Sequence, residues 1–258
     1  MRQVLLLTKL YFLGSVRRQA HLATLFLGVI LLMLPAYINA FSLGINAFER
    51  VSKDFGLTLI GYFGVAMTIL LASSSIPKDL ENRSLYPILA RPIQRYHYIC
   101  AHYLALVAQL AYSFFFLGIC LMIALAALTR SLDLGIFVGV FSSFLLCTVV
   151  GAVTMAASTV ASPALAGTVG AFVFLVGSLP GAFIRFFLVE DRDGSFAATL
   201  ATGLKAAVPN LSVFSLKDAI VHSIPFSPSY LVAAFFYALV WVLLALVTAG
   251  LLFGKRDL

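Results

Sequence analysis

Between two long apolar runs the chain reads Ser75-Ile-Pro-Lys-Asp-Leu-Glu-Asn-Arg-Ser-Leu-Tyr-Pro-Ile-Leu-Ala-Arg-Pro-Ile-Gln-Arg95. The charged residues of this stretch are Lys78, Asp79, Glu81, Arg83, Arg91 and Arg95. Pro77 suits the first position of a helix, and the acidic residues after it suit the positive end of a helix dipole. Pro87 is expected to end this helix, because a proline ring clashes with the preceding turn. The pattern predicts a cytosolic loop over 77–95 that contains a short charged helix and is available to a soluble partner.

The rest of the sequence is mostly apolar. The chain is 62% hydrophobic and 10% charged, whereas soluble domains carry about 25% charged residues. A membrane-spanning helix needs roughly 20 apolar residues, and six runs meet this need, at about 20–41, 56–76, 98–128, 134–161, 163–188 and 229–253. Unbroken apolar runs favour helices over barrel strands, in which apolar and polar residues alternate. We therefore expect an all-α membrane protein in which residues 1–258 form a single transmembrane domain.

Residues 1–19 precede the first apolar run and include Lys9, Arg17 and Arg18. We expect a helix that lies in the membrane interface, with these basic side chains at the lipid headgroups. A plain basic lead-in to the first span is the alternative. A signal peptide is disfavoured because its apolar core would follow Met1 more closely.

Basic residues set the predicted orientation. With six spans and a cytosolic N-terminus, the C-terminus is also cytosolic. This arrangement places the whole net charge of +7 on the cytosolic face and leaves the loops of the other face balanced. An excess of Lys and Arg on the cytosolic side is the usual pattern. The expected location is therefore the inner (plasma) membrane, with lipid around the spans.

Residues 189–228 form the longest predicted segment on the outer side. Two short amphipathic helices are expected at 197–208 and 211–222, divided by Pro209-Asn210, because proline lacks an amide hydrogen and restricts the residue before it. Their apolar faces are predicted to lie toward the membrane boundary and to cap the outer end of the bundle. The predicted cap residues are Leu200, Leu204, Pro209 and Phe214.

Small residues in the fifth run permit close helix contact. They are Gly167, Gly170, Ala171 and Gly177. We predict a dimer seam between the first and fifth spans of two copies. Packing within one subunit is an equally good interpretation of the same residues.

Motifs for several kinds of chemistry are missing from the sequence. There is no G-x-x-x-x-G-K-[ST] loop, so ATP would have to be bound by another polypeptide. His97 and His102 are five residues apart and off one helical face, which favours histidines at the membrane interface over a metal site. Polar residues in the middle of the predicted spans are limited to Gln109 and hydroxyls such as Ser142 and Ser143.

The chain resembles ABC-2 type permeases over nearly its whole length. The features that carry the resemblance are the six runs behind a basic N-terminus, the loop ending Ala90-Arg91-Pro92-Ile93-Gln94-Arg95, the Pro209-Asn210 break before the last run, and the tail Phe253-Gly-Lys-Arg-Asp-Leu258. Where many members carry an E-x-E-x-x-T-L turn, this chain has Asp79-Leu-Glu81-Asn-Arg-Ser84-Leu85. Pro87 interrupts a helix that is longer in the family, so a short or bent coupling helix is expected.

The resemblance implies the function. Family members pair two six-helix subunits with two ATPase subunits, so the implied protein is the non-enzymatic permease subunit of an ATP-driven exporter. It would have no cofactor of its own, since ATP and Mg would be bound by the ATPase subunit. The ATPase would contact the 77–95 loop, and the second permease copy would be identical or a paralogue. A periplasmic accessory protein is a further candidate partner, nucleic acid is not expected, and the substrate is left open.

Two other classes were weighed against this one. A membrane-embedded enzyme or scaffold would be expected to carry paired catalytic Asp, Glu or His residues at the interface. An ion-coupled carrier would be expected to carry charged residues within its spans, where they are costly and therefore functional. The sequence offers neither pattern.

Overall fold

Apolar runs fold into helices here because a helix pairs its backbone amides and carbonyls with one another. Lipid offers these groups no hydrogen-bond partners. The computed structural model describes residues 8, 11, 20–39, 45–81, 95–129, 133–179, 208–221 and 227–254. Its long helices are α2 (Ala20–Asn39), α3 (Ile45–Glu81), α5 (Arg95–Thr129), α6 (Gly135–Ser158), α7 (Pro163–Ser178) and α11 (Pro228–Gly254). Two short helices, η1 (Leu211–Phe214) and α10 (Lys217–Val221), precede α11. The described residues contain no strand, so the all-α prediction is confirmed for them.

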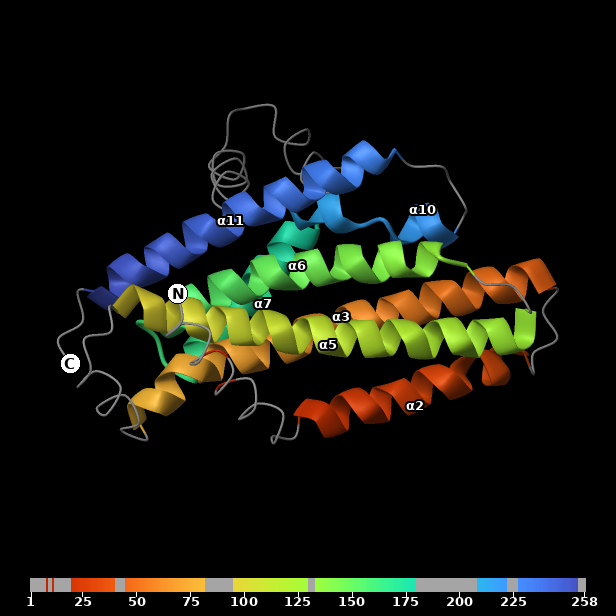
Figure 1. The fold of residues 1–258 in the computed structure, drawn as a ribbon, viewed down its shortest axis with the longest axis horizontal. Coiled ribbons are helices and arrows are strands. Elements are labelled where there is room, and N and C mark those ends of the chain that lie inside the picture. Colours follow the sequence, from red (N-terminus) through yellow and green to blue (C-terminus); the bar gives the residue numbers. More distant parts are fainter. Residues whose placement is uncertain are drawn as a thin grey trace, which may run out of the picture.

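The long helices run back and forth along one common direction (Figure 1). Successive helices of the series α2, α3, α5 and α6 point in opposite directions, so the end of α3, the start of α5 and the end of α6 share one end of the bundle. The end of α11 lies at this same end, which we call the loop end because the 77–95 segment joins α3 to α5 there. The opposite end, with the start of α3, the start of α6 and helix α10, is the cap end.

Four of the helices are long and apolar enough to cross a membrane. They contain Glu49–Pro77, Tyr96–Ala127, Gly135–Ser158 and Pro228–Gly254. The described apolar parts of the predicted first and fifth spans are shorter, at Leu22–Tyr37 and Pro163–Ser178. Four of the predicted spans thus correspond to helices that could cross a membrane by length and composition, and the count of six spans stays a prediction.

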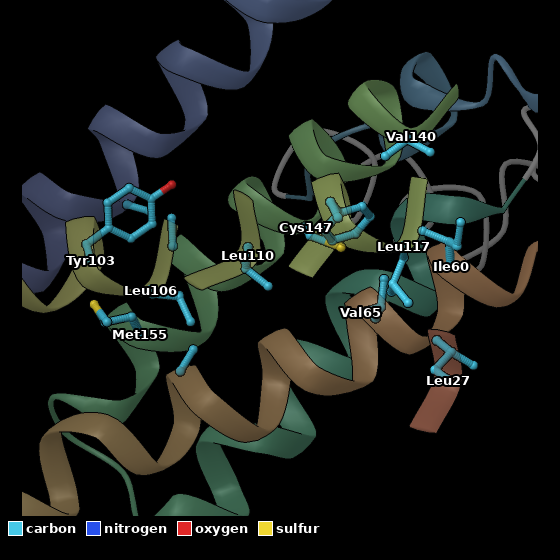
Figure 2. Close-up of a cluster of buried hydrophobic side chains, with 14 of the residues drawn as sticks. Leu27, Ile60, Val65, Tyr103, Leu106, Leu110, Leu117, Val140, Cys147 and Met155 are labelled. Atoms are coloured by element: carbon cyan, nitrogen blue, oxygen red, sulfur yellow. The ribbon is translucent and has the colours of Figure 1, made fainter. Parts of the chain in front are cut away.

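The interior of the bundle lies between α3, α5 and α6. Helix α6 is the most enclosed, with 61% of its apolar window buried, whereas α11 is the most peripheral, with 22%. Figure 2 shows the core side chains, with Tyr103 and Met155 toward one end and Ile60 and Leu117 toward the other. Large apolar side chains on the outer faces of α2, α7 and α11 remain exposed, as expected where lipid covers a helix.

Glycines on α3 allow the central helices to approach closely. A Cβ atom added at Gly56 would overlap the side chain of Leu121, and one added at Gly64 would overlap that of Phe114. Both partners belong to α5, so these two positions leave room for large α5 side chains to fill the interface. Small residues serve this purpose in membrane helices, because association there depends on packing rather than on expulsion of water.

Helix α3 differs from the prediction at both of its ends. It begins at Ile45 rather than near 56, so the charged residues Glu49 and Lys53 lie on the helix and not in a loop. Their pairing with each other and with Asp133 explains why helix is tolerated there. At the other end Pro77 lies inside α3, which continues to Glu81, so the proline does not open a separate helix.

Candidate functional site

A cavity of about 440 Å³ lies near the cap end of the bundle. Its wall is built by one part of α3, the first half of α6, the end of α7, η1 and α10. The lining residues are Leu57, Thr58, Gly61, Tyr62, Val65, Ser142, Ser143, Leu146, Phe174, Ser178, Leu211, Ser212, Phe214, Ser215, Lys217 and Asp218. Its volume falls in the range of about 300–1,000 Å³ that is usual for small-molecule sites.

The cavity wall combines apolar side chains with hydroxyl groups. The rings of Tyr62 on α3 and Phe174 on α7 meet edge to face, with centroids 6.1 Å apart. Ser142 donates its hydroxyl proton to the carbonyl of Gly139 on its own helix, at 2.9 Å. Among the described residues, Ser178 Oγ is buried without a hydrogen-bond partner. A wall of this kind can receive a molecule that is apolar along one part and hydrogen-bonding along another.

The short segment 208–221 closes one side of the cavity. The amide of Asn210 donates to Tyr237 Oη at 2.8 Å, and Tyr230 Oη donates to the carbonyl of Val213 at 2.6 Å. Both tyrosines belong to α11. Tyr237 also contacts the ring of Trp241, one turn farther along α11, with centroids 6.5 Å apart. The segment is therefore docked on α11 through two hydrogen bonds and an aromatic cluster.

The prediction for the apolar face of this segment was wrong where it can be compared. Leu211 is 1% exposed and Phe214 is 3% exposed, so both side chains point into the protein and not toward the membrane boundary. They pack into a cluster with α6 and α11 because those helices offer apolar partners directly beneath the segment. Asn210 caps η1 by accepting from the amide of Ser212. Where one helix was predicted over 211–222, the structure has the two short helices η1 and α10, and the division from a helix at 197–208 stays a prediction. Leu200 and Leu204 lie outside the described residues.

Ion pairs fasten the cap end around the cavity. Lys53 is 5% exposed, and its ammonium donates to Glu49 on its own helix and to Asp133 just before α6. Lys217 at the cavity edge binds Asp54 at 3.0 Å and Thr58 Oγ1 at 3.1 Å. The contacts of Lys53 with Asp133 and of Lys217 with Asp54 and Thr58 join α3 to the start of α6 and to α10, which are far from it in sequence.

These contacts change the pKa of the Asp133 carboxyl. Partial burial raises the pKa of its carboxyl, but the hydrogen bonds from Lys53 and from the backbone amide of Gly135 outweigh this effect. The pKa of Asp133 is consequently lowered from its ordinary value of 3.8. The carboxylate stays ionised at neutral pH and the pair with Lys53 persists there.

A second polar region lies between α2 and α5, within the bundle. The hydroxyls of Thr24 and Ser113 are 3.4 Å apart. Gln109, one turn before Ser113, is 1% exposed, and neither its amide nitrogen nor its amide oxygen has a hydrogen-bond partner among the described residues. An unpaired buried amide costs about 1–3 kcal/mol, so Gln109 is a residue that packing alone does not explain.

The histidine at 102 packs inside the bundle, and its predicted place at the membrane interface stays a prediction. His102 is buried on α5, with its ring centroid 3.8 Å from that of Tyr11 and 4.5 Å from that of Tyr98. Within the described ranges, no three His, Cys, Asp or Glu side chains gather closely enough to hold a metal ion.

Most of the predicted ATPase-coupling residues fall where side chains are not described. Lys78, Asp79 and Glu81 form the last turn of α3, and Arg95 begins α5. Arg83 and Arg91 lie outside the described residues. The structure therefore brings the end of α3 and the start of α5 to the loop end of the bundle (Figure 1).

The glycines assigned to a dimer seam make contacts within the chain. A Cβ atom at Gly170 would overlap Thr154 on α6, and one at Gly177 would lie 2.6 Å from the carbonyl oxygen of Pro209. Gly167 is in ordinary contact distance of Ile69 and Ser73 on α3, at 3.8 Å. These contacts favour the interpretation that the small residues pack α7 within one subunit. The exposed face of α7 carries large residues instead, namely Leu165, Val169, Phe172 and Leu175.

Neither a protein-family model nor a curated protein matches this chain. Sequence reasoning also missed most of the cavity, including Tyr62, Phe174 and Ser178. The sequence singled out Ser142 and Ser143, as hydroxyls inside an apolar run, and Phe214, as a predicted cap residue.

Proposed function

We propose that the chain is the membrane-spanning permease subunit of an ATP-driven exporter of the ABC-2 type, with ATP hydrolysed by a separate subunit. The observation that supports this most is the continuity of α3. This single helix of 37 residues carries five cavity residues in its middle, between Leu57 and Val65, and the first charged residues of the 77–95 segment at its end. The proposed membrane is the inner (plasma) membrane, with both termini in the cytosol.

The continuity of α3 gives the proposed mechanism a physical path. A partner that binds the 77–95 segment and changes shape with ATP would displace the loop end of α3. Because α3 is one helix, the displacement would reach its cavity-lining half as a rigid-body shift against α6. Differential binding of the partner to two such arrangements would shift the equilibrium between them and open or close the cavity.

The ATPase contact can be tested with a charge-reversal pair. The protein is purified from its native membrane, associated nucleotide-binding subunits are identified, and their ATPase activity is measured in nanodiscs. We expect Glu81→Lys combined with Arg83→Glu to lower association and coupled activity by roughly ten-fold or more, because the altered charges repel the surface that fitted them. Arg50→Glu, at the opposite end of α3 and exposed, is the matched control and should leave both unchanged. Association and activity equal to wild type in the double variant would refute the contact.

Two copies, identical or paralogous, are part of the proposal. The unpartnered apolar faces of α2 and α7 are the candidate surfaces, because both carry large exposed side chains. Cysteines replacing Leu165 or Phe172 on α7 should crosslink to the second copy, whereas a cysteine at the inward-facing Gly170 should not. Crosslinking confined to the exposed residues of α5 would place the seam elsewhere.

A further inference from the structure

The chemistry of the cavity wall narrows the kind of molecule that fits it. Only Lys217 and Asp218 among its lining residues are charged, and both belong to α10 at one edge. The ammonium of Lys217 is already engaged by Asp54 and Thr58. A charged group deeper in the cavity would lose its hydration without gaining a counter-ion, which is strongly unfavourable.

The hydroxyls of the wall favour a ligand that donates hydrogen bonds. Ser142 donates to the carbonyl of Gly139, and Ser212 donates to Asn210 Oδ1 at 2.6 Å. Each of these oxygens keeps lone pairs that can accept. Ser178 Oγ, buried and without a partner among the described residues, can both accept and donate. The polar part of the wall therefore matches a head that carries hydroxyl groups.

The remaining wall is apolar and aromatic. Leu57 and Val65 on α3 and Leu146 on α6 supply aliphatic surface, and the Tyr62–Phe174 pair supplies ring faces and edges. Such surface matches a hydrocarbon portion, because apolar contact within a membrane is favoured by close packing. The cavity thus offers separate surfaces for the two parts of an amphipathic molecule.

From these features we infer that the cavity is a binding site for an uncharged amphipathic molecule with a hydroxyl-bearing head. The inference deepens the proposed function, on which it rests for the statement that this molecule represents the exported substrate class. Binding itself does not depend on an ATPase.

Gly61 provides the sharpest test of the site. A Cβ atom at Gly61 would meet only Ser143 Oγ, at 3.7 Å, so a larger side chain there would grow into the cavity. The full-length protein is placed in phosphatidylcholine nanodiscs with a photoreactive monodecanoylglycerol, and labelled peptides are identified by mass spectrometry. We expect labelling of peptides containing Tyr62 or Phe174 and a loss of roughly ten-fold in Gly61→Leu, because the added side chain removes the binding volume. Ala66→Leu, exposed on the same helix, should label like wild type.

A second variant keeps the test decisive if Gly61→Leu does not fold. Ser178→Ala removes a hydroxyl that has no partner among the described residues, so the fold should tolerate it, yet labelling should fall by roughly five-fold, the effect of one hydrogen bond. Photoreactive decanoate and decyltrimethylammonium carry the same tail with a charged head and should label the cavity less. Equal labelling of wild type, Gly61→Leu and Ser178→Ala would show an adventitious additive only, and stronger labelling by a charged probe would overturn the ligand class. If no ATPase associates with the protein but the cavity is still labelled, the proposed function is refuted and the inferred binding site stands.

Discussion

The cap end of the bundle and the interface between α2 and α5 both bury polar groups, but they treat them differently. At the cap end, Lys53 is enclosed and bound by two carboxylates, and Lys217 is bound by Asp54 and Thr58. At the α2–α5 interface, the amide of Gln109 is enclosed and, among the described residues, bound by nothing. Paired groups of the first kind fasten helices together. A buried amide without a partner among the described residues is a cost to the fold, which makes Gln109 the stronger candidate for a role other than packing.

The largest expected effect comes from removing both partners of Lys53. Glu49→Gln combined with Asp133→Asn should lower the free energy of unfolding by about 3–5 kcal/mol, because it leaves an ammonium buried without a counter-ion. Thermal unfolding in nanodiscs measures this change. Asp54→Asn, which breaks the half-exposed pair with Lys217, is the control and should cost no more than about 1 kcal/mol.

Adding Lys53→Met to that double variant distinguishes two explanations of a loss of stability, the unpaired ammonium and the altered packing of the two carboxyl groups. If the unpaired ammonium is the cause, the triple variant should recover most of the stability, since an apolar side chain replaces the buried charge. A triple variant as unstable as the double would contradict the ion-pair argument and point to the packing of the carboxyl groups themselves.

A smaller effect of opposite sign is expected at Gln109. Gln109→Met keeps the length of the side chain and removes the unpaired amide, so the free energy of unfolding should rise by about 1–3 kcal/mol. Leu104→Met, exposed on the same helix, should change stability little. A destabilised Gln109→Met would mean that the amide is paired in the membrane, and the contrast between the two regions would then disappear.

The smallest effect is the pH dependence that Asp133 contributes. Its pKa is lowered in the folded protein, so its stabilisation is present above the ordinary value of 3.8 and is lost as the pH falls through the lowered one. Stability measured from neutral pH to about pH 3 should fall more in wild type than in Asp133→Asn. Parallel pH profiles for the two proteins would show that the pair with Lys53 contributes nothing measurable.

The sequence predicted the helices better than it predicted their ends. Runs of apolar residues were sufficient for α5, α6 and α11, whose bounds lie within a few residues of the expectation. The start of α3 was missed because Lys53 is paired with Asp133, which lies 80 residues away, and no local pattern reveals such a contact. Pro77 marked a break by its type alone, whereas α3 continues through it for one more turn.

The cavity could not be predicted from the sequence, for a different reason. Elements that are far apart in sequence build its wall. Single hydroxyls in apolar runs do not indicate a cavity, because most such hydroxyls donate to carbonyls of their own helix. Ser142 and Thr148 do this within α6. Gln109 was visible in the sequence as a polar residue inside a span, but only the structure shows that its amide is enclosed.

The aromatic cluster on α11 gives the protein a spectroscopic reporter of its own. Trp241 is the single tryptophan of the chain. It contacts Tyr237, whose ring centroid lies 6.0 Å from that of Phe214. The hydroxyl of Tyr237 also accepts a hydrogen bond from the backbone amide of Asn210. Indole emission depends on the polarity and packing around the ring, so undocking of residues 208–221 from α11 should change the fluorescence of the unmodified protein. The movements of the cap end can therefore be followed in real time without attaching a dye.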